Sequence, residues 1–232
     1  MSVAENLKTI RERVDAACER AGRRPEEVTL IAVSKTKPPS MLQEAYGAGA
    51  RDFGENKVQE ILEKYPEMPE DARFHMIGHL QTNKVKQVVG KVALIQSIGS
   101  PELLAEVDKQ AEKLGIVQDI LLEVNIGGEE SKTGVAPEAL WPLLDAAAAQ
   151  EHIRVKGLMA IPPVNDDDAR NRRYLAEVYK LFVQAGERGY SNVSMETLSM
   201  GMSGDFENAI REGATLVRIG TAIYGERDYS KK

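Results

Sequence analysis

The segment Thr29-Leu-Ile-Ala-Val-Ser-Lys35, followed directly by Thr36-Lys-Pro-Pro39, decides how the fold is interpreted. Its apolar and β-branched residues predict a strand that ends before the prolines. Side chains alternate along a strand, so Ile31, Val33 and Lys35 share one face. If that face lines a barrel interior, Lys35 stands at the mouth, where burial disfavours the ammonium and frees the amine for a Schiff base. The alternative is a surface lysine that merely ends a strand.

Composition and charge are those of an ordinary globular protein. The chain has 232 residues, 42% of them hydrophobic and 28% charged, which suits one large α/β domain or two small ones. A formal net charge of −6 argues against nucleic-acid binding. No apolar run is long enough to span a membrane, and residues 1–15 lack the apolar core of a signal peptide. The single cysteine, Cys18, forms no internal disulfide, so we expect a cytoplasmic protein.

Short apolar runs alternate with amphipathic stretches after a helix predicted over residues 1–22. The predicted strands cover 28–34, 51–53, 72–77, 92–96, 117–124, 153–159, 193–197 and 215–218. The predicted helices between and after them cover 40–48, 56–65, 81–89, 101–114, 136–149, 166–188 and 204–212.

Strict alternation of strand and helix implies a parallel sheet. Repeated strand–helix units in a chain of this length favour an α/β fold with a single (β/α)₈ TIM barrel over a doubly wound open sheet. An open sheet should carry a glycine-rich turn after its first strand, and this chain has Lys-Thr-Lys-Pro-Pro there. We therefore predict one domain over 1–232, with the barrel over 28–225 and residues 1–22 as an additional N-terminal helix.

Two glycine-containing loops follow the seventh and eighth predicted strands, where such barrels often hold phosphate groups. They offer hydroxyls and close backbone approach at Ser199, Gly201, Ser203, Gly204, Gly220 and Thr221. Either loop alone is equally well explained as a capped turn. Two such loops on consecutive strands favour a phosphate site.

Arg218 ends the eighth predicted strand, directly before the second loop. It could pair with a phosphate or donate to a ring nitrogen; the alternative is an ion pair with Glu212 or Glu226. A strand-end lysine, a phosphate cup and an arginine between them together describe a pyridoxal 5′-phosphate (PLP) site. The three histidines and one cysteine form no familiar metal-ligand spacing, so we expect no metal.

Several longer motifs run in order along nearly the whole chain. They are Ala32-Val-Ser-Lys-Thr-Lys-Pro38, Gly54-Glu-Asn56, Val58-Gln-Glu60, His75-Met-Ile-Gly-His-Leu-Gln81, Val124-Asn-Ile126, Ser131-Lys-Thr-Gly134, Gly157-Leu-Met-Ala-Ile-Pro162, Leu198-Ser-Met-Gly-Met-Ser203 and Val217-Arg-Ile-Gly-Thr-Ala222. With these motifs the chain resembles the YggS-type pyridoxal-phosphate homeostasis proteins, which are similar to the barrel domain of alanine racemase. The resemblance implies the fold type III barrel of PLP proteins.

The resemblance also assigns roles to individual residues. It makes Lys35 the lysine that holds the cofactor as a Schiff base, places Asn56 beside the cofactor, and sets Arg218 against the pyridine nitrogen. The implied phosphate cup consists of Ser199, Gly201, Ser203, Gly220 and Thr221, with Met200 in its loop. An arginine has no acceptor and does not keep the ring nitrogen protonated, so the ring is a weak electron sink. That property suits a carrier, or at most limited carbanion chemistry.

The resulting expectation is a non-catalytic, monomeric protein of intracellular PLP homeostasis, which buffers or delivers the cofactor to apo enzymes and indirectly affects amino-acid and keto-acid metabolism. The first alternative is a PLP-dependent amino-acid racemase. Racemization needs a second base, which in alanine racemases is a tyrosine of the partner subunit supported by a further β domain, and we expect no room for that domain here. The second alternative is a sugar-phosphate enzyme that uses Lys35 for a substrate Schiff base.

Overall fold

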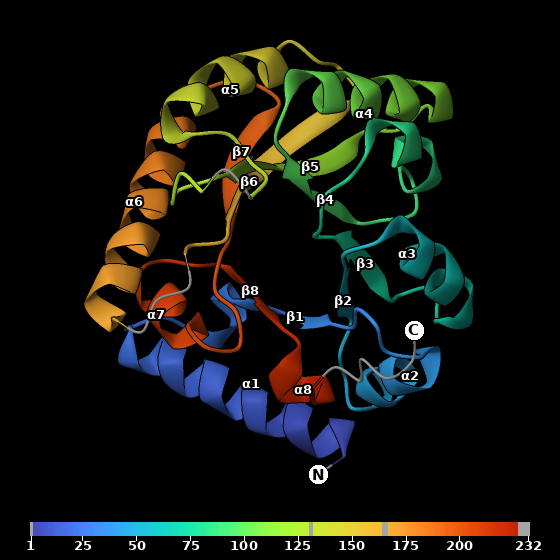
Figure 1. Cartoon of the computed structure of the whole chain (residues 1–232), viewed down its shortest axis with the longest axis vertical. Helices are drawn as coiled ribbons and strands as arrows, with labels where there is room; N and C mark the ends of the chain where they lie inside the picture. The colour runs from blue at the N-terminus through green and yellow to red at the C-terminus, as the bar shows by residue number, and fades with distance from the viewer. Residues whose placement is uncertain (1, 130–131, 164–166, 227–232) are drawn as a thin grey trace.

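The structure is a computed structural model, and it describes residues 2–129, 132–163 and 167–226. Eight parallel strands pair in sequence order and close into a barrel, because β1 pairs with both β2 and β8. Their bounds are β1 (Thr29–Val33), β2 (Asp52–Glu55), β3 (Arg73–Met76), β4 (Leu94–Ile98), β5 (Gln118–Val124), β6 (Ile153–Ala160), β7 (Val193–Ser199) and β8 (Leu216–Ile219). Figure 1 shows the strands enclosed by a ring of helices, which confirms the predicted (β/α)₈ barrel.

The outer helices are α1 (Val3–Arg20), α2 (Pro39–Gly47), α3 (Val58–Lys64), α4 (Pro101–Leu114), α5 (Leu140–Ala148), α6 (Asp168–Gly186), α7 (Phe206–Arg211) and α8 (Thr221–Tyr224). Helix α1 begins with a capping box, in which Ser2 Oγ accepts from the Glu5 amide and the Glu5 carboxylate accepts from the Ser2 amide. It packs against α2, α7 and α8. Because α8 has only four residues, α1 supplies much of the outer layer beside β8 and β1 (Figure 1).

The prediction of an α-helix over residues 81–89 was wrong. The structure has a 3₁₀ helix, η3 (Thr82–Gln87), in which the Lys84 amide bonds to the Gln81 carbonyl. The β-branched Thr82 and Val85 lose side-chain freedom in an α-helix, and no side chain caps the first turn. A short tight turn therefore forms instead of a full helix.

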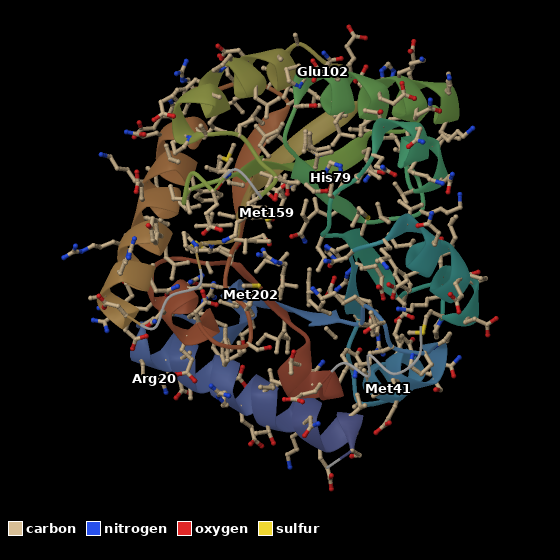
Figure 2. The ribbon with its side chains drawn as sticks, in the orientation of Figure 1. Arg20, Met41, His79, Glu102, Met159 and Met202 are labelled. Atoms are coloured by element: carbon tan, nitrogen blue, oxygen red, sulfur yellow. The ribbon has the colours of Figure 1, made fainter. Side chains whose placement is uncertain are left out.

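The side-chain alternation predicted for the first strand is confirmed. Ile31 and Val33 belong to the apolar cluster inside the barrel, whereas Ala32 belongs to the core between barrel and helices. The inner cluster also contains Ile77, Leu94, Leu121, Met159 and Leu216. Figure 2 shows Met159 and Met202 within the ring and Arg20 and Glu102 on the outer helices.

Candidate functional site

Lys35 follows the end of β1 in a tight turn at the carboxyl-terminal mouth of the barrel. The Lys37 amide donates to the Ser34 carbonyl at 3.0 Å, and Thr36 has φ 65°, a left-handed conformation that few non-glycine residues adopt. The turn places the half-buried Lys35 side chain on the wall of a cavity of about 260 Å³. The sequence-predicted lysine thus faces a cavity at the mouth of the barrel.

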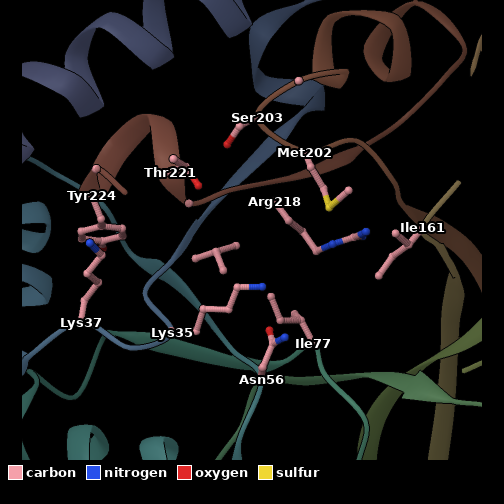
Figure 3. Close-up of a pocket in the computed structure, with 14 residues that line it drawn as sticks. Lys35, Lys37, Asn56, Ile77, Ile161, Met202, Ser203, Arg218, Thr221 and Tyr224 are labelled. Atoms are coloured by element: carbon pink, nitrogen blue, oxygen red, sulfur yellow. The ribbon is translucent and has the colours of Figure 1, made fainter. Parts of the chain in front are cut away.

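This cavity brings together six of the residues predicted from the sequence: Lys35, Asn56, Ser203, Arg218, Gly220 and Thr221. Figure 3 shows Lys35 and Asn56 on one side and Ser203 and Thr221 on the opposite side, with the Arg218 side chain reaching in between them. Side chains not predicted for the site complete its wall, among them Ile77, Ile161 and Met202. These are apolar residues in loops after β3, β6 and β7, and no sequence pattern distinguishes them from core residues.

Ser199, Met200 and Gly201 were predicted for the phosphate cup, but they do not line the cavity. Ser199 and Met200 are fully buried. Gly201 has φ 95°, and a Cβ atom there would lie 2.5 Å from Cβ of Ala209, so this glycine allows α7 to pack closely. These three residues lie behind the cavity and support its wall.

Arg218 is the cation at the centre of this wall, with a residue exposure of only 4%. Its Nη1 donates to Oγ of Ser199, and its Nη2 donates to the Ala160 carbonyl at 3.0 Å. Burial lowers the pKa of Arg218 to about 10, although the charges of Asp205 and Glu123 act against this decrease. The guanidinium therefore stays charged at neutral pH and is held from two neighbouring strands.

A chain of hydrogen bonds continues from Ser199 through the barrel interior. Ser199 Oγ donates to Oε1 of Gln96 at 2.6 Å, and Nε2 of Gln96 lies 3.2 Å from Nδ1 of His75. Since the Gln96 amide nitrogen is a donor, Nδ1 must accept, and the His75 proton is on Nε2, 3.0 Å from Oδ1 of Asp52. Burial alone would raise the pKa of Asp52, but hydrogen bonds from His75 and Arg73 outweigh it and lower that pKa to about 2.

A second buried network supports the turn that carries Lys35. Nζ of Lys64 donates to the Ser34 carbonyl at 2.9 Å, to Glu55 at 2.8 Å and to Glu60 at 2.7 Å. The same Glu60 oxygen accepts from the Thr36 amide at 2.6 Å, which holds the left-handed residue in place. Burial raises the pKa of Glu55 to about 7, even though Lys64 stabilises the carboxylate.

Tyr224 is the tyrosine that lines the cavity. Its hydroxyl is buried and has no hydrogen-bond partner in the described part of the chain. Burial, and then the negative charge of Glu55, raises the pKa of Tyr224 above its ordinary value. The phenol stays protonated at neutral pH, which does not suit a general base.

Within the described ranges, no group of three or more histidine, cysteine, aspartate or glutamate side chains is arranged to hold a metal ion. Nor does any helix in those ranges have both the length and the apolar character that a bilayer span requires. Ser131, the first residue of the motif Ser131-Lys-Thr-Gly134, lies outside the described residues.

Comparisons with known proteins agree with this geometry. The family described as "Alanine racemase, N-terminal domain" matches residues 6–228. The pyridoxal phosphate homeostasis protein of Aquifex aeolicus is 47% identical over 230 residues, which cover 99% of this chain and 100% of that protein. That of Escherichia coli K12 is 40% identical over 234 residues, covering 99% of each.

Solved structures add to this result. PipY of Synechococcus elongatus PCC7942 with PLP bound has a TM-score of 0.84 and 32% identity, covering 97% of this chain and 100% of that chain. Alanine racemase of Corynebacterium glutamicum has a TM-score of 0.72 at 17% identity, in a match that covers 95% of this chain and 61% of that chain, and so shares the fold. The chain described here belongs to the family of pyridoxal phosphate homeostasis proteins, whose barrel is the alanine racemase N-terminal domain.

Proposed function

We propose that this chain binds pyridoxal 5′-phosphate covalently through Lys35 and acts in its homeostasis, by buffering the cofactor or delivering it to apo enzymes, without catalysing a reaction of its own. One observation carries the proposal: a lysine amine, two hydroxyls and a buried guanidinium face the same cavity. PLP supplies an aldehyde that condenses with an amine, together with a phosphate and a pyridine ring.

The cavity wall fits the phosphate of such a ligand. Ser203 and Thr221 provide hydroxyl donors on the side opposite Lys35. A Cβ atom on Gly204 would meet nothing within 4 Å, so its backbone is open to approach. Gly220 has a different role, because a Cβ atom there would lie 3.1 Å from the Val33 carbonyl oxygen and crowd the end of β1.

Two features of the cavity support binding without turnover. Arg218 offers only donors, so it can bond an unprotonated ring nitrogen but cannot keep that nitrogen protonated. A racemase needs a second base opposite Lys35, and Tyr224, whose raised pKa keeps it protonated, is poorly suited to that role. The first feature limits carbanion chemistry, and the second favours a carrier over the racemase alternative.

The test is to load the purified protein with PLP and mix it with an apo PLP-dependent enzyme. Activation faster than the release of free cofactor supports delivery, and activation at the rate of release supports buffering. The same preparation should not convert L-alanine to D-alanine. Steady racemization that is lost in Lys35→Ala would overturn the proposal, and a protein that binds no PLP would favour the sugar-phosphate alternative.

A further inference from the structure

A second cavity, of about 590 Å³, lies at the carboxyl ends of β3, β4 and β5. It shares no lining residue with the cavity of Lys35 and lies on the arc of the barrel rim opposite β8. Its described wall is mainly polar and contains no lysine or arginine. The residues that matter below are His79, Ser97, Gly99, Glu123, Thr133 and Gly134.

Two buried oxygens in this wall have no partner within the described ranges. Glu123 and Ser97 are each 4% exposed. Oε1 of Glu123 accepts from Oγ1 of Thr133 at 2.7 Å, but Oε2 of Glu123 and Oγ of Ser97 have no hydrogen-bond partner among the residues that the structure describes. A buried polar group that is left without a hydrogen bond destabilises the fold. Both residues line the cavity, so a small donor that reached these oxygens from the cavity would satisfy them.

The wall around Glu123 is closely packed. Gly134 has φ 97°, and a Cβ atom on it would lie 3.0 Å from Cγ of Glu123. A Cβ atom on Gly99 would lie 3.1 Å from Cα of Gly134. Gly134 thus packs against the Glu123 side chain, and Gly99 packs in turn against Gly134.

The charge of the missing donor follows from the surroundings. No cationic side chain within the described ranges forms an ion pair with Glu123. Burial raises the pKa of Glu123, and the hydrogen bond from Thr133 and the charges of Arg218 and His79 only partly oppose this effect. A cation that contacts Oε2 would stabilise the carboxylate, whereas an anion would be repelled. A primary ammonium group carries three donors, enough for Glu123 and Ser97 together.

We propose that this cavity binds a small polar primary amine, whose ammonium group donates to Oε2 of Glu123 and Oγ of Ser97. The amide and hydroxyl groups of Gln81, Thr82 and Asn83 line the rest of the cavity and suit a polar body. The site does not depend on Lys35 or on bound PLP.

The experiment titrates the cofactor-free, ¹⁵N-labelled full chain with ethanolamine at pH 7. Ethylene glycol serves as the uncharged analogue and acetate as the anion. Saturable shifts of the Ser97 and Thr133 amide signals are expected with ethanolamine alone. Shifts that are absent, or equal with ethylene glycol, would overturn the proposal.

Variants test the assigned contacts. Glu123→Gln, which keeps the shape of the side chain, should weaken ethanolamine binding at least tenfold, and Ser97→Ala should weaken it severalfold. Glu102→Gln, on the exposed start of α4, is the matched control and should bind as the wild type does. Unchanged ethanolamine binding in Glu123→Gln would contradict the proposal. If the melting temperature of that variant is much lower than that of the wild type, ethanolamine binding by Ser97→Ala is the test instead.

Lys35→Ala separates this site from the proposed PLP site. It abolishes covalent capture of PLP if the function proposed above is correct, and it leaves ethanolamine binding within twofold of the wild type if the second site exists. Loss of ethanolamine binding in Lys35→Ala would show that the amine is held at Lys35 and would overturn the second site only.

Discussion

Arg218 and Ser199 meet inside the barrel, where Nη1 of the arginine donates to Oγ of the serine and joins β8 to β7. Ser199 donates its own proton to Gln96, so its oxygen is fixed as the acceptor for the guanidinium. Arg218 is therefore oriented toward the cavity by residues behind the cavity wall.

Ser199→Ala should lower stability, because it leaves a donor of the buried guanidinium and the Gln96 carbonyl without partners. The expected loss is about 1–3 kcal/mol in the free energy of unfolding, measured with urea. Ser203→Ala is the matched variant on the cavity wall. It should leave stability unchanged and weaken PLP binding; the reverse pattern would contradict the assignment.

Lys64→Met should be strongly destabilising, because it leaves the carboxylate of Glu55 buried without its cation. We expect a loss of about 3–5 kcal/mol in the free energy of unfolding at pH 8. Lys8→Met is the control, since Lys8 has a side-chain exposure of 80% and lies 4.0 Å from Glu12. Similar losses in both variants would rule out a special role for the buried network.

The loss in Lys64→Met should also depend on pH. The pKa of Glu55 is already about 7 in the folded protein against an ordinary 4.5, so between these values the native state binds more protons than the unfolded state. Stability from this group therefore falls as pH rises through that window. Removing Lys64 takes away the cation that stabilises the Glu55 carboxylate, so the pKa of Glu55 should rise further. The free energy of unfolding of the variant should therefore be closer to that of the wild type at pH 5 than at pH 8, measured in parallel urea titrations.

The contribution of Asp52 to stability should change with pH in the opposite direction. Its pKa of about 2 in the folded protein lies below the ordinary 3.8, so its contribution is present above pH 3.8 and is lost as pH falls through 2. The full contribution is about 2 kcal/mol. Urea unfolding of Asp52→Asn should differ from wild type by this amount at pH 6 and by much less near pH 2. Asp15→Asn, at an exposed position, should show no such change.

Gly201→Ala should disturb the packing of α7 against the cavity loop. The left-handed backbone and the clash with Ala209 together predict a loss of roughly 2–4 kcal/mol. Gly204 lies three residues away, where a Cβ atom would meet nothing within 4 Å. The melting temperature of Gly204→Ala should therefore be close to that of the wild type. Equal melting temperatures for both variants would count against this packing argument.

The barrel was predictable because each strand carries a local apolar pattern and the eight strands alternate with helices. The face of Lys35 was predictable for the same reason, since alternation in β1 sets Ile31 and Val33 inside. The packing of α7 decides which residues of the loop after β7 face the cavity. The sequence alone could not show that Ser203 lines the cavity whereas Ser199 and Gly201 do not.

Gln96 shows a further limit. It lies in an apolar run that predicts a buried strand, and its acceptor role toward Ser199 joins residues 103 positions apart. Only closure of the barrel brings such residues together. The chain of hydrogen bonds from Arg218 to Asp52 therefore had no local signal. The roles assigned to the individual cavity residues remain predictions.

Reduction of the PLP-loaded protein with sodium borohydride, followed by peptide mass spectrometry, tests the central proposal most directly. A single pyridoxyl-phosphate adduct is predicted on Lys35, present in Lys37→Ala and absent in Lys35→Ala. An adduct on Lys37 with Lys35 unmodified, or a Lys35→Ala protein that is labelled as fully as wild type, would contradict the account.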